Sequence, residues 1–261
     1  FEISNEENLY NALRMDWDKI VVESGTLSLF CHFVNDEDTE FKKSLVLFLT
    51  KKDCPETRRV LYEYLSDTDE DFLAFLLTHV KNTHLARFEI LDNLFTLLMH
   101  DSVIVRHLAE ELFLNYGSKA LPDLVRELIE SGNRSLLYQT TLQTLCISVG
   151  QNDLPTLYHA IDKADNYVRQ LIVGIISEIV CPECADIFVH FLLTTDTTVK
   201  LYIARTMGET ATEHELPLIR ELLPDQDPAV RMILYDSLSK IAKCTGGRVT
   251  FDNVDMDARE K

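Results

Sequence analysis

The residues most suited to metal binding or redox chemistry are in CPEC at 181–184. This is the one cysteine pair at the spacing of metal ligands or of a redox-active thiol pair. A redox Cys-x-x-Cys pair normally begins a helix beside a β-sheet, and no strand pattern is visible in this sequence. A structural zinc site needs about four ligands, and no second pair follows at finger-like spacing. We therefore predict structural cysteines, with Cys181 and Pro182 in a connection between helices.

A second stretch, DTDED at 67–71, carries alternate carboxylates like the start of an EF-hand calcium loop. The sixth position of such a loop is glycine and the twelfth is a bidentate glutamate. Here these positions are Phe72 and Thr78, so the pattern excludes calcium binding of that type. No glycine-rich phosphate loop, nucleophile elbow or triad-like spacing is visible. We predict no catalytic residue, no metal ligand and no cofactor, and favour a protein that is not an enzyme.

The composition is that of an acidic chain of 261 residues, with 43 Asp and Glu against 25 Lys and Arg and a formal net charge of −18. Such a charge repels nucleic acids and anionic membranes and favours basic partners. No apolar run approaches the roughly 20 residues of a membrane-spanning helix, so we expect no membrane insertion. The six cysteines stand at irregular positions, which indicates free thiols in the cytoplasm. Because the first residue is Phe1 and not methionine, we expect a fragment or trimmed chain.

Helices must position these residues, because an apolar rhythm of three and four residues recurs along the chain. Each recurrence opens with a residue whose side-chain oxygen can accept hydrogen bonds from the free amides of a first helical turn. The five clearest caps are 31 or 32 residues apart by subtraction, and extending this spacing backwards predicts two more. The seven predicted caps are Asp38, Asp71, Ser102, Asn133, Asp165, Asp196 and Asp227.

The residue three positions after each predicted cap is apolar, and the next position is Lys or Arg in five copies. These apolar positions are Phe41, Ala74, Val105, Leu136, Val168, Val199 and Val230. On the last three helices, apolar residues recur on one face, which predicts that they are buried. The core residues predicted there are Val168, Ile172, Ile176, Ile179, Val199, Ile203, Met207, Val230, Leu234 and Leu238.

Other helices lie between the capped helices, most clearly at 121–129, 154–161, 184–193 and 215–223. Gly117 and Gly150 fall where capped helices should stop, which suits a left-handed C-terminal cap. The unit is therefore two antiparallel helices, and such a pair must stack on its neighbours to bury its apolar faces. The sequence predicts an all-α array.

The segment LPLIRELLPDQDPAVRMILYDSLSKI at 216–241 resembles a HEAT repeat, in particular the short variety named after phycobilisome lyases. Leu216 and Pro217 match the first helix of that motif, and Asp227 with Val230 and Arg231 matches the second. The resemblance is strong from about 86 to 243 and weaker from 38 to 85. It implies a right-handed α-solenoid of about seven stacked antiparallel helix pairs, with the second helices on the concave face. We predict one solenoid over 1–244 with an irregular N-terminal cap at 1–35, and a polar, flexible tail at 245–261.

Some HEAT-repeat proteins are enzymes, and the deoxyhypusine hydroxylases among them bind two irons through several His-Glu pairs. This sequence has one such pair, His214 and Glu215, while His107 is followed by Leu108. One pair cannot supply a di-iron site, so we do not extend the resemblance to that activity.

Two sets of side chains are candidates for binding a partner. The acidic turns at 35–40 and 67–71 are equivalent in successive repeats, so stacking should bring their carboxylates together, either as a binding edge or as ordinary solvated turns. Four tyrosines lie on successive second helices, where core packing is the expected role of at least half and exposed ones would suit partner binding. The candidates are Asp36, Glu37, Asp38, Asp67, Asp69, Glu70 and Asp71, with Tyr138, Tyr167, Tyr202 and Tyr235.

These observations favour a non-enzymatic scaffold or adaptor that binds a protein or peptide, which could be basic, along the solenoid surface. Two alternatives stay open: a bilin lyase or its subunit, which the resemblance implies, and an interaction domain cut from a larger assembly. The fold alone does not decide among them, because function belongs to the site.

Overall fold

The computed structural model describes residues 39–51, 55–81, 90–131, 135–161, 163–179, 196–210 and 227–244, together with 188, 216, 219, 223 and 224. Several predictions from the sequence fall outside these residues. They concern the N-terminal cap at 1–35, the acidic residues Asp36, Glu37 and Asp38, the CPEC stretch, the His214–Glu215 pair and the tail at 245–261.

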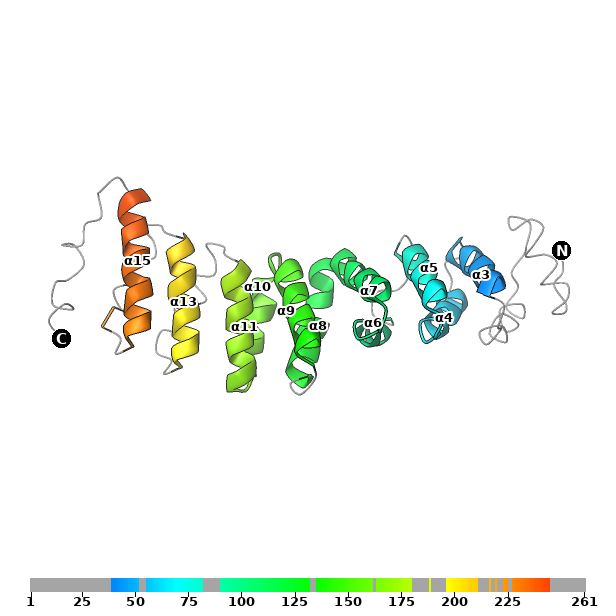
Figure 1. Ribbon diagram of the computed structural model, residues 1–261, viewed down its shortest axis with the longest axis horizontal. Helices are drawn as coiled ribbons and strands as arrows, with labels where there is room; N and C mark the ends of the chain where they lie inside the picture. Colours follow the sequence, from blue (N-terminus) through cyan, green and yellow to red (C-terminus); the bar gives the residue numbers. More distant parts are fainter. Residues whose placement is uncertain are drawn as a thin grey trace. The chain divides into compact units, whose positions relative to one another are not determined.

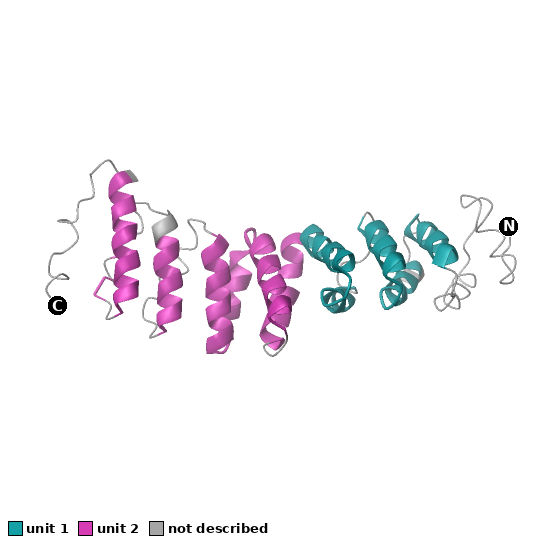
Figure 2. Cartoon of the chain, viewed as in Figure 1, with its two compact units in different colours: residues 1–116 teal, residues 117–261 magenta. Residues whose placement is uncertain are grey.

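The chain forms two compact units, residues 1–116 and 117–261 (Figure 2). The helices of unit 1 are α3 (Thr39–Lys51), α4 (Pro55–Tyr64), α5 (Glu70–Val80), α6 (Leu91–Leu97) and α7 (Val103–Tyr116). Those of unit 2 are the 3-10 turn η3 (Gly117–Ala120), α8 (Leu121–Glu130), α9 (Leu136–Gly150), α10 (Leu154–Ile161), α11 (Asn166–Ile179), α13 (Thr197–Thr210) and α15 (Pro228–Cys244). Every regular element among the described residues is helical.

Within each unit the helices stack as the repeat predicts (Figure 1). In unit 1, α3 packs against α5 and α5 against α7, while α4 and α6 pack on α3 and α7. In unit 2, α9, α11, α13 and α15 pack in series, and α8 and α10 cover α9 and α11. The prediction of an all-α solenoid is confirmed. Among the described helices, none combines the length and apolar character that crossing a bilayer requires.

Hydrogen bonds at the helix starts confirm three predicted caps and correct two. The carboxylates of Asp165, Asp196 and Asp227 accept hydrogen bonds from first-turn amides of α11, α13 and α15, at 2.8 to 3.1 Å. Helix α5, however, is capped by Asp69 and not by the predicted Asp71. Helix α9 is capped by Ser135 and not by the predicted Asn133, which lies outside the described residues. Ser102 directly precedes α7 as predicted, but its hydroxyl donates to Glu70. By subtraction, the residues that directly precede α5, α7, α9, α11, α13 and α15 are 33, 33, 30, 31 and 31 residues apart.

The same two-residue shift explains which apolar residues are buried at these helix starts. All ten core residues predicted on α11, α13 and α15 are buried. Ala74 is only half-buried and Leu136 is exposed, because Phe72 and Tyr138 stand three residues after the true caps and fill the core in their place.

The two glycines predicted to terminate helices behave differently. Gly117 follows α7 with a φ of 59°, as the left-handed cap requires. Gly150 is the last residue of α9 and is not left-handed; a Cβ there would lie 3.0 Å from Leu157 Cδ1 and 3.2 Å from Ile179 Cδ1. Its role is close packing against α10 and α11.

Candidate interaction surface

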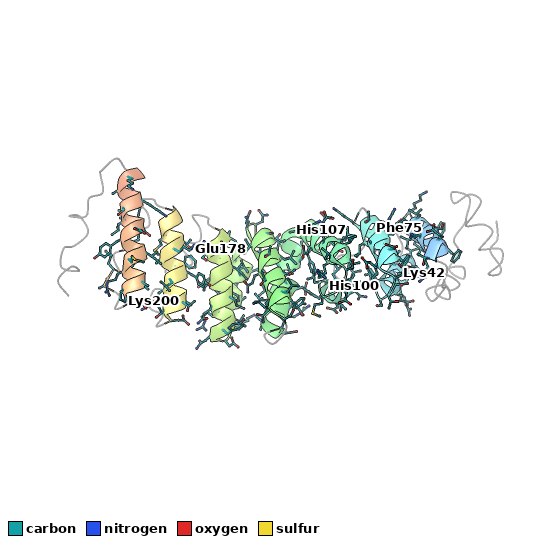
Figure 3. The ribbon with its side chains drawn as sticks, viewed as in Figure 1. Lys42, Phe75, His100, His107, Glu178 and Lys200 are labelled. Atoms are coloured by element: carbon teal, nitrogen blue, oxygen red, sulfur yellow. The ribbon has the colours of Figure 1, made fainter. Side chains whose placement is uncertain are left out.

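The acidic turn at 67–71 forms several of its polar contacts within unit 1. Lys42 is a side chain of α3 (Figure 3). Its Nζ lies 2.6 Å from Asp67 Oδ2, and the two side chains are only 9% and 10% exposed. The other oxygen of Asp67 accepts a hydrogen bond from the Asp69 amide at 2.9 Å. Asp67 therefore holds two successive repeats together and offers little surface to a partner.

Asp69 is also engaged with its own chain. One carboxylate oxygen accepts from the Phe72 amide at 3.0 Å, and the other accepts from the Thr39 hydroxyl at 2.8 Å. These hydrogen bonds, that of Phe72 first, hold the pKa of Asp69 below its usual value. Charge at this position stabilises the start of α5 and its contact with α3.

Glu70 and Asp71 are the described members of the acidic set that remain exposed. They occupy the first two positions of α5. Glu70 also accepts a hydrogen bond from the Ser102 hydroxyl, which joins the first turns of α5 and α7. The predicted acidic edge therefore retains these two side chains.

The four candidate tyrosines separate by burial. Tyr138 is 1% exposed and donates its hydroxyl proton to Glu127 at 2.8 Å, so it is a core residue and not part of a binding surface. Tyr167 is exposed, and its hydroxyl lies 3.0 Å from Gln139 Oε1 of α9. Tyr202 is half-buried over Gly174, where a Cβ would lie 3.3 Å from the tyrosine ring, and Tyr235 is half-buried on α15.

Exposed aliphatic side chains in the first turns of the second helices are further candidates, which were not predicted from the sequence. Val103 and Ile104 begin α7, and Leu136 and Leu137 begin α9. Tyr167 on α11 stands at the position equivalent to Ile104 and Leu137, two residues after the cap. The sequence did contain a signal for Val103 and Ile104. They stand between the predicted cap Ser102 and the predicted core residue Val105, which places them outside the buried face of the helix.

Helix α9 presents an uncharged surface below these leucines. Its 15 residues include no Asp, Glu, Lys or Arg, in a chain of net charge −18. The exposed hydroxyls of Thr140, Thr144 and Ser148 each donate a 2.9 Å hydrogen bond to the carbonyl four residues earlier. Their donors are thus satisfied inside the helix, so covering this surface costs little desolvation. We call Leu136, Leu137, Thr140, Thr144 and Ser148 the α9 strip.

Titratable side chains in the described residues offer little reactive chemistry. Cys146 is buried, and burial raises the pKa of its thiol to about 12, which makes the thiolate inaccessible near neutral pH. His107 lies 3.9 Å from Glu110 and 3.8 Å from Glu111 on the exposed side of α7. Among the described residues, no group of three or more His, Cys, Asp or Glu could hold a metal ion.

Comparison with known proteins identifies the repeat. Residues 154–239, which span α10, α11, α13 and most of α15, match the family model of HEAT repeats. The recognition of HEAT repeats from the sequence is thereby confirmed. No curated protein matches the chain.

Two solved structures are similar to the chain at 15% identity and a TM-score of 0.32. One is a designed armadillo repeat protein in complex with the peptide (KR)4; the match covers 82% of this chain and 99% of that one. The other is the Escherichia coli protein YibA, where the match covers 93% of this chain and 98% of that one.

Proposed function

We propose that this chain, which carries HEAT repeats, is a non-enzymatic scaffold or adaptor that binds a protein or peptide partner through the exposed surface of its second helices. The net charge of −18 favours a basic partner at long range.

The observation that carries this proposal is the α9 strip. Leu136 is 80% exposed and Leu137 is 66% exposed, while the packing of α9 is supplied by other side chains of the helix such as Tyr138 and Leu142. Two adjacent leucines that the fold leaves in water, continued by an uncharged helix surface, are typical of a protein interaction site. The strip covers just over three turns of helix, or about 18 Å, enough for a short peptide.

The exposed Tyr167 supports the same surface. It lies beside the first turn of α9, since its hydroxyl contacts Gln139. Tyr202 and Tyr235, which are half-buried on α13 and α15, stand farther from their caps than Tyr167 does. Tyrosine combines a large apolar ring with a hydrogen-bonding group and is enriched among residues that dominate binding energy.

The proposal is tested by photo-crosslinking in a lysate of the source cell, from a benzoylphenylalanine placed at position 137. We expect a protein crosslink, identified by mass spectrometry, that is lost when Leu136→Ser and Thr140→Glu are added. The matched control places the photoprobe at Met232, which is 65% exposed on α15 and lies outside the α9 strip.

Both labelled proteins must keep the helical circular dichroism and thermal midpoint of the unmodified chain. The same crosslink from both positions, unaffected by the added substitutions, would show that the α9 strip does not select a partner.

A further inference from the structure

We infer that the first turns of α5 and α7 in unit 1 form a second docking site, which takes an extended segment carrying two apolar side chains followed by lysine or arginine. This inference rests on the proposed function and deepens it by naming the chemistry of one partner segment. We call Glu70, Asp71, Val103 and Ile104 the α5–α7 edge.

The apolar half of the edge is not explained by packing. Val103 is 68% exposed and Ile104 is 60% exposed, although Val105, the next residue, is fully buried. β-branched residues have lower helix propensity than alanine or glutamate, so they are not favoured at an exposed helix start for local reasons. Met99, 47% exposed in the turn before α7, adds to the apolar surface at this end.

The acidic half lies directly beside it. Glu70 and Asp71 occupy the same two positions after the cap of α5 as Val103 and Ile104 occupy after Ser102. The hydrogen bond from the Ser102 hydroxyl to Glu70 holds the two first turns next to each other. Asp101, also exposed, adds a third carboxylate at the start of α7.

Three of the described cations at this end of unit 1, Lys42, Lys43 and Arg106, have partners other than the edge. Lys42 pairs with Asp67, and Lys43 lies 3.0 Å from Glu40. Arg106 donates to the backbone carbonyls of His100 and Asp101 at 2.6 and 2.9 Å. Among the described residues, these three cations do not pair with Glu70 or Asp71. The two carboxylates can therefore attract a cation of a partner, which gives the occupant its basic character.

The geometry sets the order of the occupant's side chains. Packed helices lie about 8–10 Å apart, which is about three residues of extended chain. A segment with its apolar pair on Val103 and Ile104 would therefore place a residue two or three positions later over Glu70 and Asp71. The peptide GLLSKRKG has this spacing, GSSSKRKG lacks the apolar pair, and GLLSQSQG lacks the charges.

The experiment is a titration of the full chain, methyl-labelled at isoleucine, with each of the three peptides. The Ile104 methyl signal is assigned by its loss in Ile104→Val. We expect GLLSKRKG to shift this signal saturably and to bind about fivefold or more tightly than either control peptide. Val103→Ser, which keeps the Ile104 methyl as the reporter, should weaken binding about fivefold at all salt concentrations. Asp71→Lys should weaken it at low salt and have little effect at 0.5 M salt.

Three outcomes would overturn the inference. Equal binding of GLLSKRKG and GSSSKRKG would reduce the edge to non-specific charge attraction. Binding that Leu136→Ser/Leu137→Ser abolishes and Val103→Ser leaves intact would place the peptide on the α9 strip, which refutes this site while the proposed function stands. Concentration-dependent dimerisation that Ile104→Ser abolishes would make the occupant a second copy of this chain.

Discussion

Asp69 and Asp196 occupy the same position in their repeats, and each joins the first turn of its own helix to a neighbouring repeat. Asp196 accepts from the amides of Thr198 and Val199 and, on its other oxygen, from Gln170 of α11 at 2.8 Å. The pKa of Asp196 is lowered, first by Gln170 and then by these amides, and the pKa of Asp69 is lowered in the same manner. Negative charge at these caps therefore favours the folded state.

The pH dependence of stability follows from the sign of these shifts. Because each pKa is lower in the folded protein, the stabilisation is full above the unfolded value of about 4 and is lost as the pH falls through the folded value. We expect the double variant Asp69→Asn/Asp196→Asn, which keeps a capping oxygen at both positions, to lose less in thermal midpoint between pH 5 and pH 2.5 than the unmodified chain loses. Asp236→Asn, which alters an exposed carboxylate of α15, is the control, and an identical fall in all three proteins would contradict the assignment.

Gly117 is the residue whose backbone conformation most restricts substitution. A Cβ at this position would meet no atom within 4 Å, so the cost of a side chain is purely that of the left-handed backbone. We expect Gly117→Ala to lower the free energy of unfolding by about 1 kcal/mol, and Gly117→Asn by less, since asparagine tolerates this conformation. Urea denaturation measures both; an unchanged midpoint for Gly117→Ala would mean that the terminus of α7 can rearrange.

At the scale of the element, one helix face carries the packing energy and the opposite face carries the candidate binding residues. Ile172 of α11 is fully buried, whereas Leu137 of α9 is 66% exposed. We expect Ile172→Ala to cost about 2–5 kcal/mol in unfolding free energy, because it removes buried methyl groups and leaves a cavity. Leu137→Ala should change stability by no more than about 0.5 kcal/mol.

Chemical denaturation of the two variants makes this a matched comparison, since each shortens an aliphatic side chain to alanine in a second helix. Similar losses in both would show that Leu137 packs against the protein and does not belong to the α9 strip.

At the scale of the whole molecule, polar contacts recur at about the length of one repeat. In unit 1, three side-chain hydrogen bonds join residues that are 30 to 32 positions apart: Thr39 with Asp69, Ser102 with Glu70, and Lys81 with Glu111. In unit 2, the Ser237 hydroxyl reaches the Ala204 carbonyl 33 residues earlier. Stability in such an array is approximately a sum of repeat and nearest-neighbour terms.

This additivity predicts that a core defect remains local. We expect Ile172→Ala to accelerate amide hydrogen exchange most in α11 and next in α9 and α13, with little change in α3 and α5. Hydrogen exchange read by mass spectrometry of proteolytic peptides would measure it. Uniform acceleration from α3 to α15 would indicate that the whole chain unfolds as one cooperative body.

The paired-helix repeat, the helices α8 and α10 and the buried residues of α11, α13 and α15 could be predicted from the sequence, because caps and apolar periodicity act within a few residues of the chain. The starts of α5 and α9 could not be fixed, since Asp67, Asp69 and Asp71 are all able to cap, as are Asn133 and Ser135. The burial of Phe72 and Tyr138 selects one register among these, and that burial depends on neighbouring helices.

The candidate surface depended still more on tertiary structure. The charge and residue types of the acidic turn are visible in the sequence, but its ion pair with Lys42 joins residues 25 positions apart. That contact removes Asp67 from the surface and leaves Glu70 and Asp71 exposed. Tyr138 and Tyr167 look alike in sequence, yet Tyr138 faces the core and Tyr167 faces water. Tyr138 stands three residues after its cap and Tyr167 stands two, and one residue of difference rotates a side chain by about 100° around the helix.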